Sequence, residues 1–305
     1  MYKNIFKSIV LLSFFQTVAQ QTPNDVSENY FTENDTVKTL NEVVINGKNN
    51  PSKSSVNRAG IKEKDLPQAI QVIGTEIIQQ QQSIRLSDVV KNANGVYVGS
   101  ARGGAQESFW SRGYDMSANN MFKNGFRFNS GSIPEVASLE KVEILKGSAA
   151  LLYGNVAPGG IMNMVTKSPN FRTGGEITMQ AGSYSFYKPS ADVYGAFNNS
   201  IAYRFNGSYE NSESFRDYVT RERYYVNPSL LFKVSDKTEI TLQADYLSDD
   251  WTPDFGTGSI GKEIANVPRN AYLGAKWSNG NTKQVTASIL VNHEFNKNWK
   301  LNFNS

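Results

Sequence analysis

Two stretches of the chain carry residue types that enzymes use, and neither completes a catalytic site. Residues 256–263 read GTGSIGKE, which fits a GxGxxG pattern, but Glu263 stands where the phosphate-binding pattern GxxxxGK[ST] needs a Mg²⁺-binding hydroxyl. The single histidine, His293, has no serine elbow or acid partner in its strand. With 0 Cys and 1 His among 305 residues, Cys-built and His-clustered metal sites are excluded. We therefore expect no catalytic residue, no metal site and no cofactor.

Residues 40–47, LNEVVING, form a short β-favouring run between polar segments. Residues 20–39 and 48–58 are rich in Asn, Asp, Glu, Lys, Ser and Thr, a composition typical of disorder. A strand with no partner in its own segment is suited to adding to the edge of another protein's sheet. The alternative is that it joins the following domain as an edge strand.

Residues 1–20 have the layout of a signal peptide. Lys3 and Lys7 precede the apolar block 8–15, and Ala19 provides a small residue for cleavage. The block lacks the 3.6-residue period of an amphipathic helix, which is the alternative. The sequence thus predicts export. The net charge of +3 is too small to indicate a nucleic-acid partner.

Residues 59–170 read as one compact α+β domain punctuated by glycines. Its predicted strands are 69–74, 96–98, 142–147 and 161–166. Its predicted helices are 75–84 and 87–91, with a helical turn at 148–153. Gly125, Gly147, Gly154, Gly159 and Gly160 stand at turns, where glycine permits a positive φ or a close backbone approach.

From residue 171 the apolar residues alternate with polar ones at every second position, which indicates β-strands. The predicted strands are 176–182, 187–197, 201–210, 222–234, 238–247 and 284–295, with a seventh beginning at 299–303. Tight turns near 198–200 and 235–237 contrast with the long connection 248–282, an asymmetry typical of an outer-membrane barrel with an aromatic-rich apolar face. A soluble β-sandwich or lipocalin-like barrel would also alternate and remains the alternative.

The motifs of residues 40–169 resemble those of TonB-dependent outer-membrane receptors, ferric-siderophore branch. LNEVVING is similar to the TonB box, RGY at 112–114 to an RGF-like turn, and LEKVEILKGSAALLYGNVAPGGIMNMVTKSP at 139–169 to the plug signature. Tyr114 and Ser148 depart from the usual Phe and Pro. The resemblance implies an α+β plug inside an antiparallel transmembrane β-barrel of about 22 strands. Fewer residues follow Pro169 than such a barrel needs, so we expect a fragment holding the first six or seven strands.

The resemblance also implies a division of the chain and roles for single residues. The division is signal peptide 1–20, periplasmic tail 21–58 with the TonB box at 40–45, plug 59–170 and partial barrel 171–305. The residues expected to bind TonB are Leu40, Asn41, Glu42, Val43, Val44 and Ile45. Those expected at ligand-facing plug tips are Arg102, Gln106, Trp110, Tyr114 and Met116. Those expected to support the plug are Arg112, Gly113, Glu140, Glu143, Lys146, Gly147, Gly154, Gly159, Gly160 and Asn163.

The function that the resemblance implies is TonB-dependent uptake of a ferric siderophore across the bacterial outer membrane, with iron present only in the transported chelate. TonB with its inner-membrane motor, the siderophore and membrane lipid are the expected partners of a monomer. In the family Arg112 and Lys146 match basic residues that pair with barrel carboxylates; Glu140 and Glu143 are expected to pair locally with Lys141 or Arg112. A plug without His argues against haem. Cobalamin or saccharide uptake, and a passive porin or adhesin, remain alternatives.

Overall fold

The computed structural model describes residues 69–117, 119–128, 131–147 and 153–305. All of them belong to one compact unit, Lys48–Ser305. Among these residues no helix is long and apolar enough to cross a membrane. The predicted signal peptide, the run 40–47 and most of the predicted helical turn 148–153 lie outside the described residues.

The first part of the fold, residues 69–167, is here named the plug part. Its larger sheet has five strands in the order β1-β7-β8-β5-β6, and its smaller sheet has the order β2-β3-β4. β1 pairs antiparallel with β7 and β5 pairs parallel with β8. The strands are β1 (Ala69–Gly74), β2 (Val96–Val98), β3 (Phe109–Ser111), β4 (Tyr114–Asp115), β5 (Met121–Lys123), β6 (Phe126–Arg127), β7 (Leu139–Lys146) and β8 (Ile161–Thr166). The helices are α1 (Thr75–Gln80), α2 (Leu86–Val90) and the 3₁₀ turn η2 (Arg102–Gly104).

The core of the plug part lies between α2 and the larger sheet. Leu86, Val89 and Val90 of α2 pack in one buried cluster with Val142 and Ile144 of β7. Because apolar side chains of both elements leave water there, this cluster fixes where α2 begins.

The helix predicted over 75–84 is shorter than expected, because α1 ends at Gln80. Gln82 takes a φ of 51°, in the left-handed region that a helix does not contain. Only Ile78 of α1 is buried, so few contacts favour a longer helix. The chain instead turns and brings Leu86 into the core.

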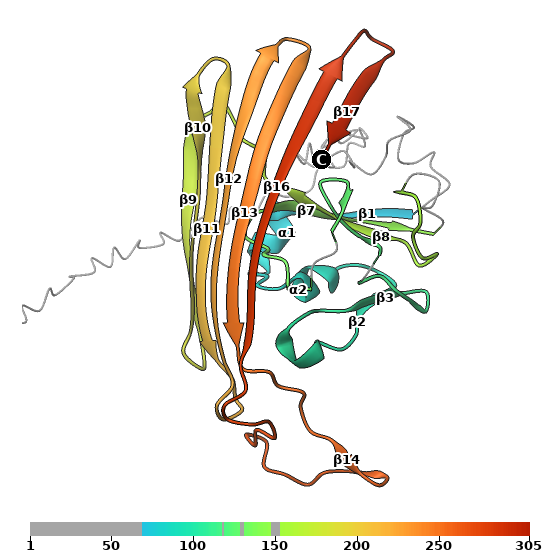
Figure 1. Cartoon of the computed structure of the whole chain (residues 1–305), viewed down its shortest axis with the longest axis vertical. Coiled ribbons are helices and arrows are strands. Elements are labelled where there is room, and N and C mark those ends of the chain that lie inside the picture. The colour runs from blue at the N-terminus through green and yellow to red at the C-terminus, as the bar shows by residue number, and fades with distance from the viewer. Residues whose placement is uncertain (1–68, 118, 129–130, 148–152) are drawn as a thin grey trace, which may run out of the picture. The chain divides into compact units, whose positions relative to one another are not determined.

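The second part is a seven-stranded antiparallel sheet in the order β17-β16-β13-β12-β11-β10-β9, named here the wall sheet (Figure 1). Its strands are β9 (Gly174–Gly182), β10 (Phe186–Asn198), β11 (Ile201–Glu213), β12 (Thr220–Ser235), β13 (Thr238–Trp251), β16 (Gly280–Glu294) and β17 (Lys300–Asn304). All seven predicted strands are therefore found, joined in sequence order.

The two ends of the wall sheet differ. Residues 199–200, 236–237 and 295–299 make short turns at one end, the turn end. At the other, the loop end, β11 connects to β12 through 214–219, and β13 connects to β16 through 252–279, which includes the small hairpin β14 (Ser259–Ile260) and β15 (Glu263–Ile264). The connection 183–185 between β9 and β10 is also at the loop end and is short, so the predicted asymmetry holds for the long β13–β16 connection and the shorter turns opposite it.

On β10 to β13 the inner face of the wall sheet is mostly polar and buried, whereas the outer face is apolar and more exposed. On β11, Ala202, Asn206 and Glu210 are at most 1% exposed, while Phe205 on the opposite face is 43% exposed. A soluble sheet has the reverse arrangement, with its apolar face buried. The plug part, with α1, α2 and β7, lies against the inner face (Figure 1).

Three tyrosines lie side by side on the outer face near the loop end. The ring centroids of Tyr187 and Tyr209 are 5.7 Å apart, and those of Tyr209 and Tyr224 are 4.7 Å apart. The hydroxyls of Tyr209 and Tyr224 both donate to Glu222, at 2.8 and 2.7 Å. We name this group the tyrosine ladder.

Candidate functional site

Four charged side chains follow one another across four neighbouring strands on the inner face of the wall sheet. Glu210 of β11 lies opposite Arg223 of β12, and Arg223 lies opposite Asp249 of β13. On β10, the Lys188 Nζ lies 3.8 Å from the Glu210 carboxylate. Side chains opposite each other in paired strands lie close enough to interact. The register therefore builds an alternating row, Lys188, Glu210, Arg223 and Asp249, which we name the wall charge row.

The wall charge row is buried, since each of its four residues is 3% exposed or less. Buried charges are stable only when they are paired and hydrogen-bonded. Arg221 adds a fifth charge, because its guanidinium donates two hydrogen bonds to the Asp249 carboxylate at 2.9 and 2.6 Å. The wall charge row is thus a buried ion-pair network rather than a set of surface ion pairs.

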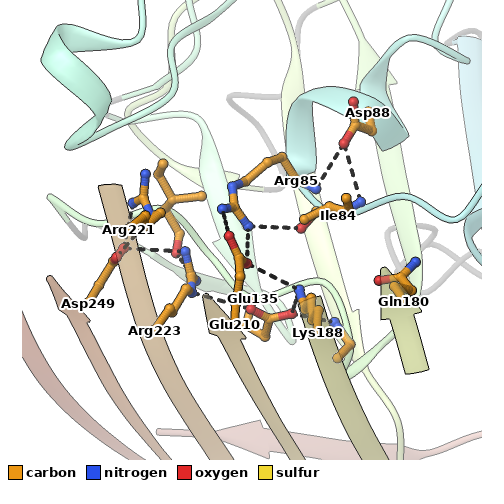
Figure 2. A network of polar contacts seen from close by, with 12 residues as sticks. Ile84, Arg85, Asp88, Glu135, Gln180, Lys188, Glu210, Arg221, Arg223 and Asp249 are labelled. Carbon is orange, nitrogen blue, oxygen red and sulfur yellow. Dashed lines mark hydrogen bonds and ion pairs between the residues drawn. The ribbon is translucent and has the colours of Figure 1, made fainter. Parts of the chain in front are cut away.

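The plug part contributes one cation and one anion to this network, as Figure 2 shows. The Arg85 guanidinium contacts both oxygens of Glu210, with Nη1 2.7 Å from Oε2. The Glu135 carboxylate lies between two wall cations, with Oε1 2.7 Å from Lys188 Nζ and Oε2 3.3 Å from Arg223 Nε. Arg223 also donates to the backbone carbonyl of Ile133. These contacts dock the plug part on β10, β11 and β12.

The position of Arg85 follows from the turn that starts α2. The Asp88 carboxylate accepts the backbone N–H groups of Ile84 and Arg85 at 3.2 and 3.0 Å. Burial by itself would raise the pKa of Asp88, but hydrogen bonds from Lys91 and from these N–H groups lower it overall. Asp88 thereby fixes the backbone at Arg85, whose side chain extends to the wall sheet (Figure 2).

Glu135 carries its negative charge in a fully buried place. Burial by itself would raise its pKa, but the charges of Lys188 and Arg223 outweigh burial and lower the pKa to about 2. Its Oε1 also accepts the backbone N–H of Ala137 at 3.1 Å. At neutral pH the Glu135 carboxylate is therefore ionised.

A second group of contacts joins the plug part to β12, β13 and β16. Lys123 Nζ lies 2.6 Å from the Asp245 carboxylate, which also accepts the Tyr225 hydroxyl. The Tyr225 hydroxyl is 2.8 Å from that of Ser138. Side-chain hydrogen bonds also join Asn124 and Thr166 to Gln243, and Ser132 to Gln284. These contacts fix the plug part to the wall sheet at a second place, on β12, β13 and β16.

The turn η2 of the plug part meets the loop end of the wall sheet. The carbonyl of Gly103 accepts the backbone N–H of Asp254 at 3.1 Å, and that of Gly104 accepts from Arg221 at 3.0 Å. Gly103 has a φ of 67°, in the left-handed region that glycine adopts most readily, and a Cβ there would also lie 2.7 Å from the ring of Phe255. The loop after β13 thus holds the plug tip against the wall.

Cationic and aromatic side chains gather on the two loops at this end. Arg216 and Arg269 both lie over the Phe215 ring, at 5.4 and 5.1 Å from its centroid, and Lys276 lies 4.2 Å from the centroid of Tyr218. Arg216 also pairs with Asp254 at 2.8 Å. The sequence analysis missed these residues because the two loops are distant in sequence; their shared Arg, Lys, Phe and Tyr content was the available signal. We name this group the loop-end cations and aromatics.

The five residues predicted at plug tips divide into two groups. Arg102 is exposed and lies 3.4 Å from Gln106, while Trp110 pairs with Asp115 in the small hairpin that exposes Tyr114. Ligand contact by these four remains a prediction. Met116 is wrong as a ligand-facing residue, because it is 0% exposed and belongs to the core of the plug part. Met116 directly follows β4, and its apolar side chain packs into the buried cluster of the plug part.

The residues predicted to support the plug part have local roles. Glu143 pairs with Lys141 at 2.9 Å and accepts from Asn163 at 3.0 Å, which confirms local pairing for Glu143. Within the described ranges no ion pair joins Arg112, Glu140 or Lys146 to another residue, so their predicted pairing stays a prediction.

At Gly159 and Gly160 another part of the backbone comes too close for a side chain. A Cβ on Gly160 would lie 2.4 Å from the carbonyl oxygen of Leu145, and one on Gly159 would lie 2.6 Å from that of Ser111. These close approaches confirm the expectation for both positions. The remaining predicted glycines have positive φ values: Gly113, Gly125, Gly147 and Gly154.

The two enzyme-like features stay apart from these contacts. Residues 256–263 lie in the β13–β16 connection, which includes the hairpin β14–β15 rather than a strand-to-helix turn. His293 of β16 hydrogen-bonds Thr238 at 2.8 Å and packs on Phe295. Among the described residues no group of His, Cys, Asp and Glu could hold a metal ion.

Comparison with known proteins gives one family. Residues 62–161 match the model of the TonB-dependent receptor plug domain. The chain is 30% identical over 263 residues to the metal-pseudopaline receptor CntO of Pseudomonas aeruginosa, covering 81% of this chain and 36% of that receptor. It is 30% identical over 254 residues to the ferrioxamine B receptor of Salmonella typhimurium, covering 79% and 35%.

The fold also matches a solved structure. The ferric-catecholate import receptor Fiu from E. coli K12, in an open form, matches with a TM-score of 0.70 and 26% identity over 76% of this chain and 37% of that one. The chain thus spans about a third of the length of these relatives. All three are receptors, in agreement with the expectation that no catalytic site is present. A plug part docked on a barrel-type wall, together with these matches, places the chain in the family of TonB-dependent outer-membrane receptors.

Proposed function

We propose that the protein acts in TonB-dependent uptake of an anionic metal–siderophore chelate across the bacterial outer membrane. The observation that carries this proposal is the docking of the plug part on the inner face of the wall sheet through buried ion pairs. Such a plug opposes free diffusion along the wall. Passage of a large solute then needs an energy source that displaces the plug part.

The chemistry of the loop end supports an anionic ligand. Arg102 lies on the plug tip, and Arg269 and Lys276 lie on the loop after β13, over the aromatic rings of Phe215 and Tyr218. Cationic side chains beside aromatic rings favour a negatively charged ligand. The relatives bind metal-pseudopaline and ferrioxamine B by name, which supports a metal chelate as the class.

The coupling that we propose starts at residues 40–45. TonB would add a strand to Val43, Val44 and Ile45 and pull through the tail 21–58 on the plug, residues 59–170, inside the barrel that begins at 171. Backbone hydrogen bonds give such an added strand its grip, since side-chain identity matters little to the ladder. Iron enters only as part of the cargo.

The test is uptake of ⁵⁵Fe-loaded pseudopaline, pyoverdine, ferrioxamine B and a catecholate by cells that carry or lack the native gene. We expect one chelate to enter only when both the gene and an energised TonB system are present. Val44→Pro should abolish this uptake and leave surface binding intact, because proline removes a ladder N–H. Normal uptake by Val44→Pro would contradict the coupling role.

Two alternatives give different results in the same cells. Cobalamin or saccharide transport would keep the TonB dependence but show no response to any iron chelate. A passive porin or adhesin would ignore an uncoupler, and its function would not require a docked plug part.

A further inference from the structure

The Glu135 carboxylate of the plug part lies between two cations of the wall sheet. Its two oxygens face Lys188 Nζ at 2.7 Å and Arg223 Nε at 3.3 Å. Lys188 and Arg223 are 3% and 1% exposed, so both are more than nine-tenths buried. They come from β10 and β12, with Glu210 of β11 between them. The wall thus offers two buried cations to one carboxylate supplied from outside the sheet.

The wall alone has an excess of positive charge in this region. Its cations are Lys188, Arg221 and Arg223, and its carboxylates are Glu210 and Asp249. Arg85 and Glu135 of the plug part add one charge of each sign. When the plug part moves away, Lys188 and Arg223 lose an anion that they share. The vacated place then opens to the lumen, and two neighbouring cations held by the wall attract a soluble anion in place of the Glu135 carboxylate.

Glu135 does not use all the hydrogen-bonding capacity of this place. Arg223 Nε is buried and makes no hydrogen bond within the described part of the chain, although Glu135 Oε2 is 3.3 Å away. The other donors of Arg223 face Asp249 and the Ile133 carbonyl. An oxyanion that is not tied to the plug backbone is free to approach Nε more directly.

We propose that Lys188 and Arg223 form a carboxylate-binding site in the barrel wall, which Glu135 fills while the plug part is docked and which an anionic group of the cargo fills during passage. The second half of this statement rests on the proposed function. The first half does not, since it concerns only the wall and a carboxylate.

The site is tested by restoring a deleted carboxylate from solution. Glu135→Ala removes the side-chain carboxylate, and acetate is a soluble carboxylate of similar size that can occupy the space left by it. In the purified receptor, about 200 mM acetate should raise the Tm of Glu135→Ala by about 2 °C or more above sodium chloride of equal ionic strength. Glu135→Gln fills the same space without charge, so its Tm should respond equally to both salts. In Glu135→Ala/Lys188→Met the acetate response should disappear.

An equal response of Glu135→Ala to acetate and chloride would overturn the site, as would an acetate response that persists without Lys188. These outcomes require no transport and so are independent of the proposed function. If uptake by the wild-type receptor proves independent of TonB, the proposed function fails and the acetate result still stands.

A second variant tests the role in passage. Lys188→Met should lower the maximal rate of chelate uptake about fivefold or more without changing surface affinity. Lys167→Met is the matched control: Lys167 is also buried and pairs with a wall carboxylate, Asp192, at 2.9 Å, but it belongs to the plug part. We expect its uptake to stay within about twofold of wild type. Equal losses in both variants would contradict a wall site for cargo.

Discussion

The Arg85 guanidinium contacts both carboxylate oxygens of Glu210, 125 residues further along the chain, with Nη1 2.7 Å from Oε2. Arg85 is the N-cap residue that precedes α2 in the plug part, and Glu210 is 1% exposed on the inner face of β11. This pair joins the start of a plug helix to the centre of the wall charge row. Loss of Glu210 takes away the carboxylate that Arg85 contacts, and loss of Arg85 leaves the buried Glu210 with only the more distant Lys188 at 3.8 Å.

Arg85→Met and Glu210→Met should each destabilise the receptor by about 3–5 kcal/mol, because an uncompensated buried charge is costly. The double variant should be more stable than at least one single variant, since it removes both charges. Thermal unfolding in detergent measures all three. Lys91→Met is the control, as its pair with Asp88 is exposed and should contribute less than about 1 kcal/mol. Additive losses in the double variant would argue against direct coupling.

Acid should weaken the docking of the plug part through Glu135. Its pKa is lowered from 4.5 to about 2 by Lys188 and Arg223 against the effect of burial. A group with a lowered folded-state pKa stabilises the fold above its unfolded pKa, so this contribution of about 3 kcal/mol is lost as pH falls from 4.5 towards 2.

The measurement for this pH effect is protease cleavage of the plug part in outer-membrane fragments across that pH range, with an acid-stable protease. Glu135→Gln has no carboxyl group to titrate, so its pH dependence should be shallower than that of the wild type. Identical curves for the two proteins would show that another group controls the acid response.

Gly160→Ala should prevent normal folding of the plug part. Gly160 has a φ of 124°, and an added Cβ would lie 2.4 Å from the Leu145 carbonyl oxygen, which is backbone and cannot rotate away. Gly258→Ala is the matched control, because nothing lies within 4 Å of its Cβ position and its φ is not positive. Protease resistance of the plug part after outer-membrane isolation distinguishes them. A fully resistant Gly160→Ala receptor would contradict the close approach.

Arg102→Glu should weaken ligand binding about tenfold or more, because it reverses a charge on the exposed plug tip that faces an anionic chelate. Equilibrium binding of the chelate identified by the uptake screen measures the effect. Lys262→Glu makes the same change in the turn between β14 and β15, at a residue that is not one of the loop-end cations and aromatics, and should leave affinity within about twofold. Unchanged affinity in Arg102→Glu would remove Arg102 from the ligand site.

Most of the wall sheet was predictable because its pattern is local. Alternation along 201–210 places Phe205 and Asn206 on opposite faces, and the structure exposes the first and buries the second. The end of α1 was not predictable, because it depends on how the chain must turn to bring Leu86 into the core. Met116 was misassigned since a loop of mixed residues does not reveal which side chain points inward.

The wall charge row could not be predicted from one sequence. A polar residue at every second position is expected on an inner face, whether it faces water or a plug. The partner of Lys188 is Glu135, 53 residues earlier, and no local pattern links them. Only the register of β10 to β13 and the position of the plug part bring these charges together.

The tyrosine ladder should mark the height of the receptor in its lipid layer. Tyr187, Tyr209 and Tyr224 place aromatic rings on the outer face, and Glu222, which accepts hydrogen bonds from two of their hydroxyls, is an ionic group that is unfavourable in hydrocarbon. The boundary between acyl chains and headgroups should therefore lie at the level of these three rings. The segment from Glu222 to the loops 214–219 and 252–279 should then extend beyond the acyl chains into the headgroups and the water outside them.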